Sequence, residues 1–408
     1  MTAVHGLGQL LKDPVYLRIW LVGFCGGVAR WLELLVAGVF AVEVTGSPFL
    51  VALLIVLRLA PMAVLGTIVG TFADRLQPRL FLGVGQAVAS VISATVCLLF
   101  VLDIAVYWHV AAATFASGVI WTTEMPLRRR IVGDIAGRER LAPAMSFDSA
   151  TNNATPMIGP LLGGILYQVL GASGAFAISA TLFAIAVILL TGVPAAASVV
   201  NAAGRSTKIL RDFRDAFSYV AADPDILRIF AVTAVFNIWA FPFVAMIPVI
   251  GREELGVGAG WIGFLAGLEG GGAFLGALVI AVAARARHFR RLYFFGVLGY
   301  LVLVFVAGWM THHLPMAFVL LTVGLAGAGF TTMQSVLVYV VAPPEMRGRL
   351  FGIMVLCIGT GVLGYLNIGL MGEWYGGSAA IRIVAAEGIV PLLLIGIGWR
   401  ALWRPVDD

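Results

Sequence analysis

Long apolar runs, interrupted only by short charged or turn-rich segments, occupy nearly all of this 408-residue chain. Hydrophobic residues make up 61% of the sequence and charged residues only 12%, which is more apolar surface than one water-soluble core can bury. Each run approaches the roughly 20 residues that a helix needs to cross a bilayer. Because the runs do not alternate apolar with polar residues, they exclude a transmembrane β-barrel. The sequence therefore predicts an all-α polytopic membrane protein.

The breaks between the runs predict twelve transmembrane helices in two six-helix halves. The expected helices cover residues 16–43, 48–73, 80–102, 105–127, 142–170, 172–193, 226–251, 258–284, 292–310, 314–342, 350–372 and 379–402. Breaks on one side of the membrane contain nearly all the Lys and Arg residues, whereas those on the other side contain only Arg252 and Arg382. The positive-inside rule then predicts a cell (inner or plasma) membrane protein with both termini in the cytoplasm.

The one long break divides the chain into an N-terminal half (1–193), a cytoplasmic linker (194–225) and a C-terminal half (226–408). Apolar residues of the linker recur at helical spacing, which favours an amphipathic surface helix over a simple connecting segment. The halves share two short matches. TTEM at 122–125 corresponds to TTMQ at 331–334, and GRERL at 137–141 corresponds to MRGRL at 346–350, and both pairs are separated by the same number of residues. Duplicated halves are common in secondary transporters.

The sequence contains no pattern that predicts an enzyme, a cofactor or a metal site. Its five histidines form no HExxH, and neither GxSxG nor GxxxxGK[ST] occurs, which also argues against direct use of ATP. The three cysteines lie singly within apolar runs. The basic residues lie in short loops between spans, so the net charge of +5 does not predict a nucleic-acid partner. Transport of a small molecule is the function that remains.

A loop after the second expected span resembles a motif of the major facilitator superfamily. Residues 70–79 read GTFADRLQPR, similar to the family pattern GxxxD-[RK]-x-G-[RK], with Gln77 where a glycine is usual. The resemblance covers nearly the whole chain and implies that Asp74 meets the start of helix 11 and favours an outward-open state; an ordinary solvated turn is the alternative. The implied conformational gate comprises Gly70, Asp74, Arg75, Arg79, Arg347, Gly348 and Arg349.

The fifth expected span carries a second motif. Gly159, Pro160, Gly163 and Gly164 resemble the GPxxGG core of drug and proton antiporters, in the branch of small-molecule and siderophore exporters. Proline kinks a helix, and small residues one turn apart let another helix pack closely. We expect the glycine-rich eighth span to be that partner. The resemblance implies transport out of the cell.

Ionisable side chains within the spans are the best candidates for the site, because each costs about 2.5–3.5 kcal/mol to insert. The candidate substrate and proton-coupling residues are Arg30, Glu33, Arg58, Asp148, Asn237 and Glu269. Arg30 and Glu33, three residues apart on one helix, either neutralise each other or serve transport. In the second case we expect Glu33 and Glu269 to exchange a proton, since desolvation favours a neutral carboxyl group and a nearby guanidinium a charged one.

Other polar groups in the spans leave several readings open. Asp148 and Glu124 are assigned either to the gate or to ion pairs with Arg128 to Arg130, and no role is predicted for Glu387. The amide and indole groups that are candidates to line a cavity or to bond neighbouring helices are Asn237, Trp239, Gln334 and Asn367.

Together these features predict a monomeric secondary transporter that exports a small organic molecule (a drug, a siderophore or a metabolite) by alternating access, with protons as the coupling ion. Uptake or facilitated transport of a small solute or lysolipid is the alternative within transport. A membrane-embedded enzyme is the alternative outside it. The charge of the substrate stays open, because the buried acids favour a cation and the buried arginines an anion.

Overall fold

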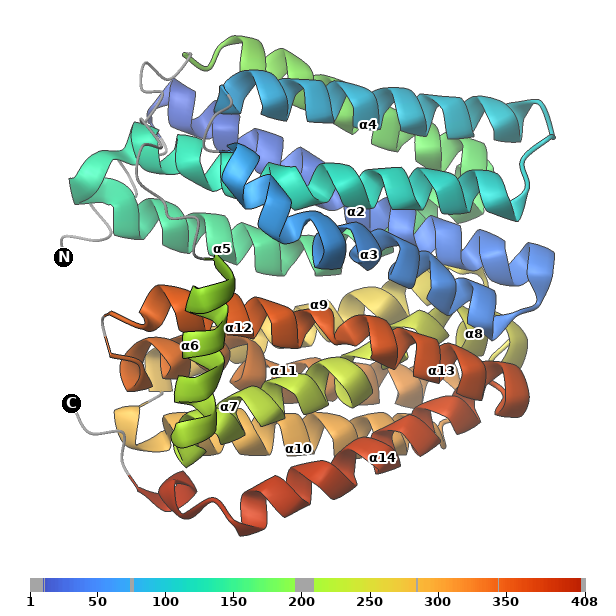
Figure 1. The fold of residues 1–408 in the computed structure, drawn as a ribbon. Helices are drawn as coiled ribbons and strands as arrows, with labels where there is room; N and C mark the ends of the chain where they lie inside the picture. The colour runs from blue at the N-terminus through green and yellow to red at the C-terminus, as the bar shows by residue number, and fades with distance from the viewer. Residues whose placement is uncertain are drawn as a thin grey trace. The chain divides into compact units, whose positions relative to one another are not determined.

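The structure is a computed structural model that describes residue 10 and residues 12–73, 77–194, 209–283, 285–343 and 345–404. The described chain is almost entirely helical, and the expected all-α class is confirmed (Figure 1). The α-helices are α2 (Pro14–Thr45), α3 (Pro48–Ala73), α4 (Pro78–Val101), α5 (Tyr107–Thr191), α6 (Ile209–Ala222), α7 (Pro224–Val235), α8 (Ile247–Val249), α9 (Ala259–Ala283), α10 (Phe289–Ala307), α11 (His313–Val341), α12 (Arg347–Gly359), α13 (Gly361–Tyr375) and α14 (Gly377–Ile397). Short π or 3-10 segments are η1 (Phe236–Ala240), η2 (Phe241–Met246), η3 (Ile250–Glu254), η4 (Ala286–His288) and η5 (Arg400–Trp403).

Nine helical segments of the described chain are long and apolar enough to cross a membrane, fewer than the twelve expected. One of the nine, Pro143–Thr191, spans two expected crossings, and the described apolar part of α3, Pro48–Met62, is shorter than the rest. The first part of α5 is not among the nine. The protein is a multi-pass membrane protein.

Prolines and aspartates define where several helices begin. Pro14, Pro78 and Pro224 lie in the first turns of their helices. Backbone N–H groups at these positions have no acceptor within the helix, so the N–H that proline lacks costs no hydrogen bond. Asp13 Oδ1 accepts the N–H of Val15 at 2.9 Å, and Asp223 caps α7 in the same way. These starts are therefore encoded locally.

Helix α5 comprises three pieces that glycines separate. Gly137 (φ 66°) and Gly171 (φ 70°) adopt backbone angles that side chains disfavour, and they divide α5 into residues 107–136, 138–170 and 172–191. These pieces fall on the fourth, fifth and sixth expected spans. The expected end at 127 and start at 142 are wrong. The first piece continues through the charged segment and ends at Gly137, and the second piece begins directly after it.

The seventh expected span, 226–251, is not a regular helix. After α7 the chain passes through the π-helix η1, the 3-10 helix η2, the short helix α8 and the π-helix η3. Pro242 and Pro248 lie within this stretch and cannot donate the backbone hydrogen bond of a continuous α-helix. The irregular geometry is the consequence.

The chain forms two compact units. Unit 1 contains Met1–Thr45, Leu57–Gly204 and Gly258–Gly267, and unit 2 contains Gly46–Val56, Arg205–Val257 and Leu268–Asp408. Helix α6 lies inside the expected linker, with Phe217 exposed and Val220 buried, whereas the side chains of Ile209, Leu210 and Phe213 lie outside the described residues. The boundaries 1–193, 194–225 and 226–408 stay a prediction.

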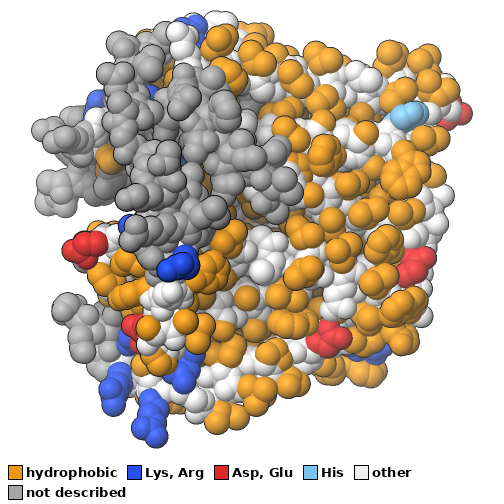
Figure 2. Space-filling view, in the orientation of Figure 1, with side chains coloured by type: hydrophobic (Ala, Val, Ile, Leu, Met, Phe, Trp, Pro, Cys, Tyr) orange, Lys and Arg blue, Asp and Glu red, His pale blue; other side chains and the backbone are white. Residues whose placement is uncertain are grey.

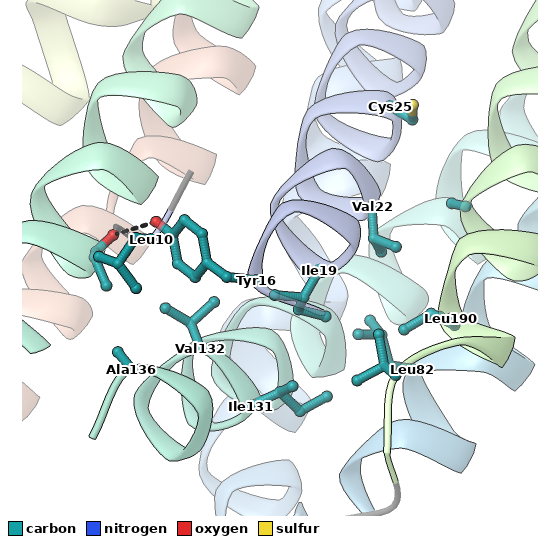
Figure 3. Packing of buried hydrophobic residues seen from close by; sticks show 13 residues of the cluster. Leu10, Tyr16, Ile19, Val22, Cys25, Leu82, Ile131, Val132, Ala136 and Leu190 are labelled. Carbon is teal, nitrogen blue, oxygen red and sulfur yellow. Dashed lines mark hydrogen bonds between the residues drawn. The ribbon is translucent and has the colours of Figure 1, made fainter. Parts of the chain in front are cut away.

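Apolar side chains cover much of the described surface and also form a packed core within unit 1. Figure 2 shows hydrophobic side chains over most of the described face, with Lys and Arg gathered mainly toward one edge. At one end of unit 1, Tyr16 and Ile19 of α2 pack with Leu82 of α4 and Val132 of α5, and the Tyr16 hydroxyl donates to Ala144 O at 3.3 Å (Figure 3). Such packing fixes the rotation of α2 against α5, which positions the polar residues of α2 described next.

Candidate functional site

Unit 1 contains a set of buried polar side chains within its helices, which we call the polar cluster. Helix α2 contributes Arg30 and Glu33, α3 contributes Arg58, α4 contributes Ser93, and α5 contributes Glu124 and Ser179. Each of the six side chains is at least nine-tenths buried. Two guanidinium groups and two carboxyl groups therefore lie in a medium where an unpaired charge is costly.

Arg30 does not pair with Glu33. Its Nη1 donates to Glu124 Oε2 in α5, so of the two alternatives for Arg30 and Glu33 the mutual ion pair within α2 is not formed. Arg58 Nη1 donates to the carbonyl oxygen of Arg30 at 2.9 Å, and its guanidinium lies 5.5 Å from the ring centroid of Trp121. Arg58 thus bonds to backbone and an aromatic face, an arrangement that leaves Glu33 without an arginine partner.

Glu33 is held by two serine hydroxyls. Ser93 Oγ and Ser179 Oγ lie 2.5 Å and 2.6 Å from the same carboxyl oxygen, Glu33 Oε1. Ser93 Oγ also lies 3.0 Å from Ala89 O. Among the described residues Glu33 forms no ion pair. A hydroxyl can donate or accept, so these partners satisfy Glu33 with or without a proton.

A small cavity borders this carboxyl group. Its polar lining includes Glu33, Arg58, Ser93 and Ser117. Nearby in α4, Gln86 is fully buried, and neither atom of its amide has a hydrogen-bond partner in the described part of the chain. The interior of unit 1 therefore contains an amide group that forms no hydrogen bond with the described residues.

Asp148 belongs to an ion-pair network in α5. Arg128 Nη1 donates to Asp148 Oδ1, Arg129 Nε lies 3.7 Å from Oδ2, and Asn152 Nδ2 donates to Oδ2 at 3.3 Å. The ion pairing expected for Asp148 is present. The ion pairing expected for Glu124 with Arg128 to Arg130 is wrong among the described residues, since its partner is Arg30.

The conformational gate is described only in part. Asp74 and Arg75 lie outside the described residues, and Gly70 is described only as part of α3. Arg79 Nη2 donates to Thr191 O at 2.8 Å, and Arg347 stacks on Tyr339 with its guanidinium carbon 4.0 Å from the ring centroid. Gly348 has open space beside it, and Arg349 Nη1 lies 3.7 Å from Met346 Sδ. The latch between Asp74 and the start of α12 stays a prediction.

The glycines of the antiporter-like motif pack against two helices. A Cβ on Gly159 or Gly163 would lie 2.9 Å from a backbone oxygen of α2, on Val28 and Leu32 respectively. A Cβ on Gly164 would lie 2.8 Å from the Cα of Gly263 in α9. The eighth span is therefore the partner of Gly164, as expected, whereas Gly159 and Gly163 pack on the first span instead. Pro160 lies between these contacts inside α5.

Comparison with known proteins identifies the family. Residues 19–364 match the Major Facilitator Superfamily. The chain belongs to this superfamily. An uncharacterized MFS-type transporter of Bacillus subtilis (strain 168), YfiS, is 23% identical over 381 residues, which cover 90% of this chain and 88% of that protein.

Solved structures of other superfamily transporters share the fold. The nucleoside transporter NupG has a TM-score of 0.72 at 14% identity and covers 94% of this chain and 99% of its own. A bacterial homolog of the human lysosomal transporter Spinster, inward-facing and occupied, has a TM-score of 0.73 at 16% identity, with 94% and 96% covered. A D-xylose-proton symporter has a TM-score of 0.70 at 15% identity, with 95% and 98% covered. At these identities the likeness concerns the fold alone.

In unit 2 of this transporter the candidate residues are more dispersed. Tyr300 OH donates to Glu269 Oε1 at 3.2 Å. Asn237 Nδ2 donates to Thr233 O at 2.9 Å within its own helical stretch. Gln334 is buried, and its Nε2 has no partner among the described residues. Tyr300 lies against Phe236, which stacks on Phe330. Glu269 therefore adjoins an aromatic core and not a polar cluster.

Sequence reasoning missed four residues of the unit 1 site. Ser93, Ser179 and Gln86 are single polar residues in apolar runs, and Trp121 provides the aromatic face for Arg58. Small polar residues in membrane helices are common as packing groups, so their occurrence alone does not mark a site. What identifies these residues is their burial on the sides of α4 and α5 that face α2, and this is known only from the tertiary structure.

We expect Gly164→Ala to destabilise the transporter. The added Cβ would press on the backbone of α9, and overpacking of this kind costs about 1–3 kcal/mol. The readout is the unfolding midpoint of the purified protein in detergent. The matched control is Gly83→Ala in α4, where the nearest atom lies 4.0 Å from the new Cβ and helix propensity favours alanine. Equal midpoints for the two variants would show that α5 and α9 do not approach this closely.

Proposed function

We propose that this protein is a proton-coupled secondary transporter that exports a small organic molecule by alternating access, and that Glu33 carries the coupled proton. The observation that supports this proposal most directly is that Glu33 forms hydrogen bonds with two serine hydroxyls and no ion pair with an arginine among the described residues. Ionisable groups buried in membrane proteins commonly mark proton relays.

The hydrogen bonds of Glu33 support proton exchange without a broken ion pair. When the carboxyl group is ionised, Ser93 and Ser179 both donate to it. When it is protonated, it donates to Ser93, whose own hydrogen turns to Ala89 O at 3.0 Å. In both states Glu33 Oε1 and the two serine hydroxyls keep a hydrogen-bond partner, so the change of protonation leaves none of these three atoms unsatisfied.

Protonation changes the charge balance of the polar cluster. With both carboxyl groups ionised, Arg30 and Arg58 balance Glu33 and Glu124. Adding a proton to Glu33 leaves one unit of positive charge in a region of low effective dielectric, where a charge interacts several times more strongly than in water. A proton can shift a conformational equilibrium only through such a difference in interaction energy between two states. A cationic substrate would compete with the proton for the same negative charge.

Glu269 is the corresponding candidate in unit 2. Among the described residues its one side-chain hydrogen-bond partner is the hydroxyl of Tyr300, so it too can change protonation without losing a salt bridge there. The contact of 3.2 Å is longer than those at Glu33, and only one hydroxyl is present. We therefore place the main coupling role on Glu33 and a secondary one on Glu269.

The direction of transport rests on the antiporter-like motif. Gly159, Pro160, Gly163 and Gly164 resemble residues typical of exporters, and the close packing of Gly159 and Gly163 on α2 connects that motif to the helix that carries Glu33. The cytoplasmic termini and the monomeric state complete the proposal as expectations from the sequence.

The experiment that tests the proposal uses purified protein in proteoliposomes with an imposed pH gradient. Cationic drugs, siderophores and lysolipids are offered in turn while internal pH and compound are both followed. A compound that moves against protons, and whose movement stops when the gradient is dissipated, supports the proposal. A compound that equilibrates at the same rate with and without the gradient supports facilitated transport and removes proton coupling.

A further inference from the structure

One carboxyl group lies on the outer apolar surface of unit 2. Glu387 is midway along the 21-residue helix α14, and its side chain is exposed. The residues one and two turns further along the same face, Val390 and Leu394, are 60% and 66% exposed. A helix of this length spans about 30 Å, so Glu387 lies near the middle of the hydrocarbon layer.

The neighbouring helix presents a matching surface. Asn367 of α13 lies between the exposed side chains of Leu363 and Leu370, one turn away on either side. Asn367 Nδ2 donates to Glu387 Oε2 at 2.8 Å. An amide bonded to a carboxyl group, surrounded by exposed leucines and valine, forms a polar spot within a surface that otherwise suits lipid tails.

Trp239 completes the spot from η1. Its Nε1 donates to the same oxygen, Glu387 Oε2, at 3.2 Å. Both donors are uncharged, and no ion pair of the described residues includes Glu387. Oε1 of Glu387 is left for another partner. The two N–H groups hold Oε2 as an acceptor, and such hydrogen bonds strengthen when a cation pairs with the carboxyl group.

A cation that pairs with this carboxyl group has to reach it through lipid. A metal ion or a hydrated inorganic cation would have to enter the hydrocarbon layer. The ammonium group of an amphiphilic amine arrives with its own apolar tail, which suits the exposed leucines, and a tryptophan ring adjacent to the carboxyl group favours a cation further.

We infer that Glu387, Trp239 and Asn367 form a lipid-facing binding site for the ammonium group of a membrane-partitioned amphiphilic amine. The tail would lie along Leu363 and Leu370 of α13 and Val390 of α14. The inference does not rest on proton coupling or on the direction of transport, because it concerns binding alone.

The test is photolabelling of the full chain in lipid nanodiscs. The probe is an alkyltrimethylammonium with a diazirine beside the ammonium group, and its matched control is the alkyl alcohol with the same chain and diazirine. We expect the ammonium probe to label α13 and α14 peptides and the alcohol to label them weakly. In Glu387→Gln the ammonium labelling should fall about tenfold, as for loss of one charge–charge contact in a medium of low dielectric. Glu345→Gln, which removes an exposed carboxyl group in the turn before α12, should leave it unchanged.

Three outcomes would overturn the inference. Equal labelling of these peptides by the two probes would show a surface that takes any alkyl chain. Unchanged labelling in Glu387→Gln would remove the carboxyl group from the site. Ammonium labelling of α13 and α14 that is lost when each nanodisc holds two copies of the chain would assign the surface to self-association. Should Glu387→Gln fail to fold, competition decides on the wild-type protein: excess unlabelled alkyltrimethylammonium must suppress the labelling and the alcohol must not.

Discussion

Glu33→Gln is expected to reduce proton-driven transport to the level of protein-free liposomes. Glutamine has the shape of glutamic acid, and its amide can both accept from and donate to Ser93 and Ser179, so the fold should persist. It cannot lose a proton, so the cycle would lose the step that couples transport to the gradient. The measurement is flux of the exported compound under an imposed pH gradient.

Counterflow without a gradient provides the internal control for this variant. Exchange of labelled for unlabelled compound requires binding and conformational change but no net proton movement, so Glu33→Gln should retain it. Glu269→Gln tests the second carboxyl group, and Glu345→Gln controls for loss of one acidic residue at an exposed position. Unchanged proton-driven flux in both Glu33→Gln and Glu269→Gln would exclude these residues as the coupling groups.

Asp148→Ala is expected to lower the free energy of unfolding by about 3–5 kcal/mol, because it leaves the charge of Arg128 buried without a partner. The side chains of Arg128 and Asp148 are 3% and 2% exposed, and Asn152 supplies only a neutral contact at 3.3 Å. The measurement is equilibrium unfolding of the purified protein in mixed micelles with increasing denaturing detergent.

Two comparisons make this result specific to the buried pair. Arg129→Ala removes a partner whose side chain is 43% exposed and 3.7 Å from Asp148, so it should cost under about 1 kcal/mol. The double change Arg128→Met with Asp148→Leu should regain much of the lost stability, since an apolar pair of similar volume avoids the desolvation of both charges. A cost for Asp148→Ala no larger than that for Arg129→Ala would show that the pair does not hold the fold.

Local sequence was sufficient for much of the secondary structure and for the choice of fold class. Apolar runs require helices in lipid, because every backbone group must bond within its own segment. Pro14, Pro78 and Pro224 begin helices, and Gly171 separates two of them, for reasons that lie within a few residues, whereas the break at Gly137 was not predicted. The same reasoning failed in the seventh span. A regular helix was predicted there, although Pro242 and Pro248 interrupt the backbone hydrogen bonds of an α-helix.

The pairing of charges could not be derived in the same way. Sequence spacing placed Arg30 and Glu33 on one helix face and so suggested that they pair. In the structure Arg30 bonds to Glu124, which is far away in the sequence, and Glu33 bonds to two serines from two other stretches of chain. Spacing along one helix determines its own faces but carries no information on which residues of another helix lie opposite.

The sequence by itself thus determined that this chain crosses a membrane as helices, which residues within those helices carry charge, and that its loops resemble those of one transporter superfamily. Only the tertiary structure decided which of these charges are paired. The physical reason is that the rotation of each helix about its own axis depends on the helices packed against it, as where Gly159 and Gly163 lie on the backbone of α2 at distances that any side chain would prevent. Together the rotations of α2, α4 and the pieces of α5 bring Glu124 to Arg30 and leave Glu33 to Ser93 and Ser179.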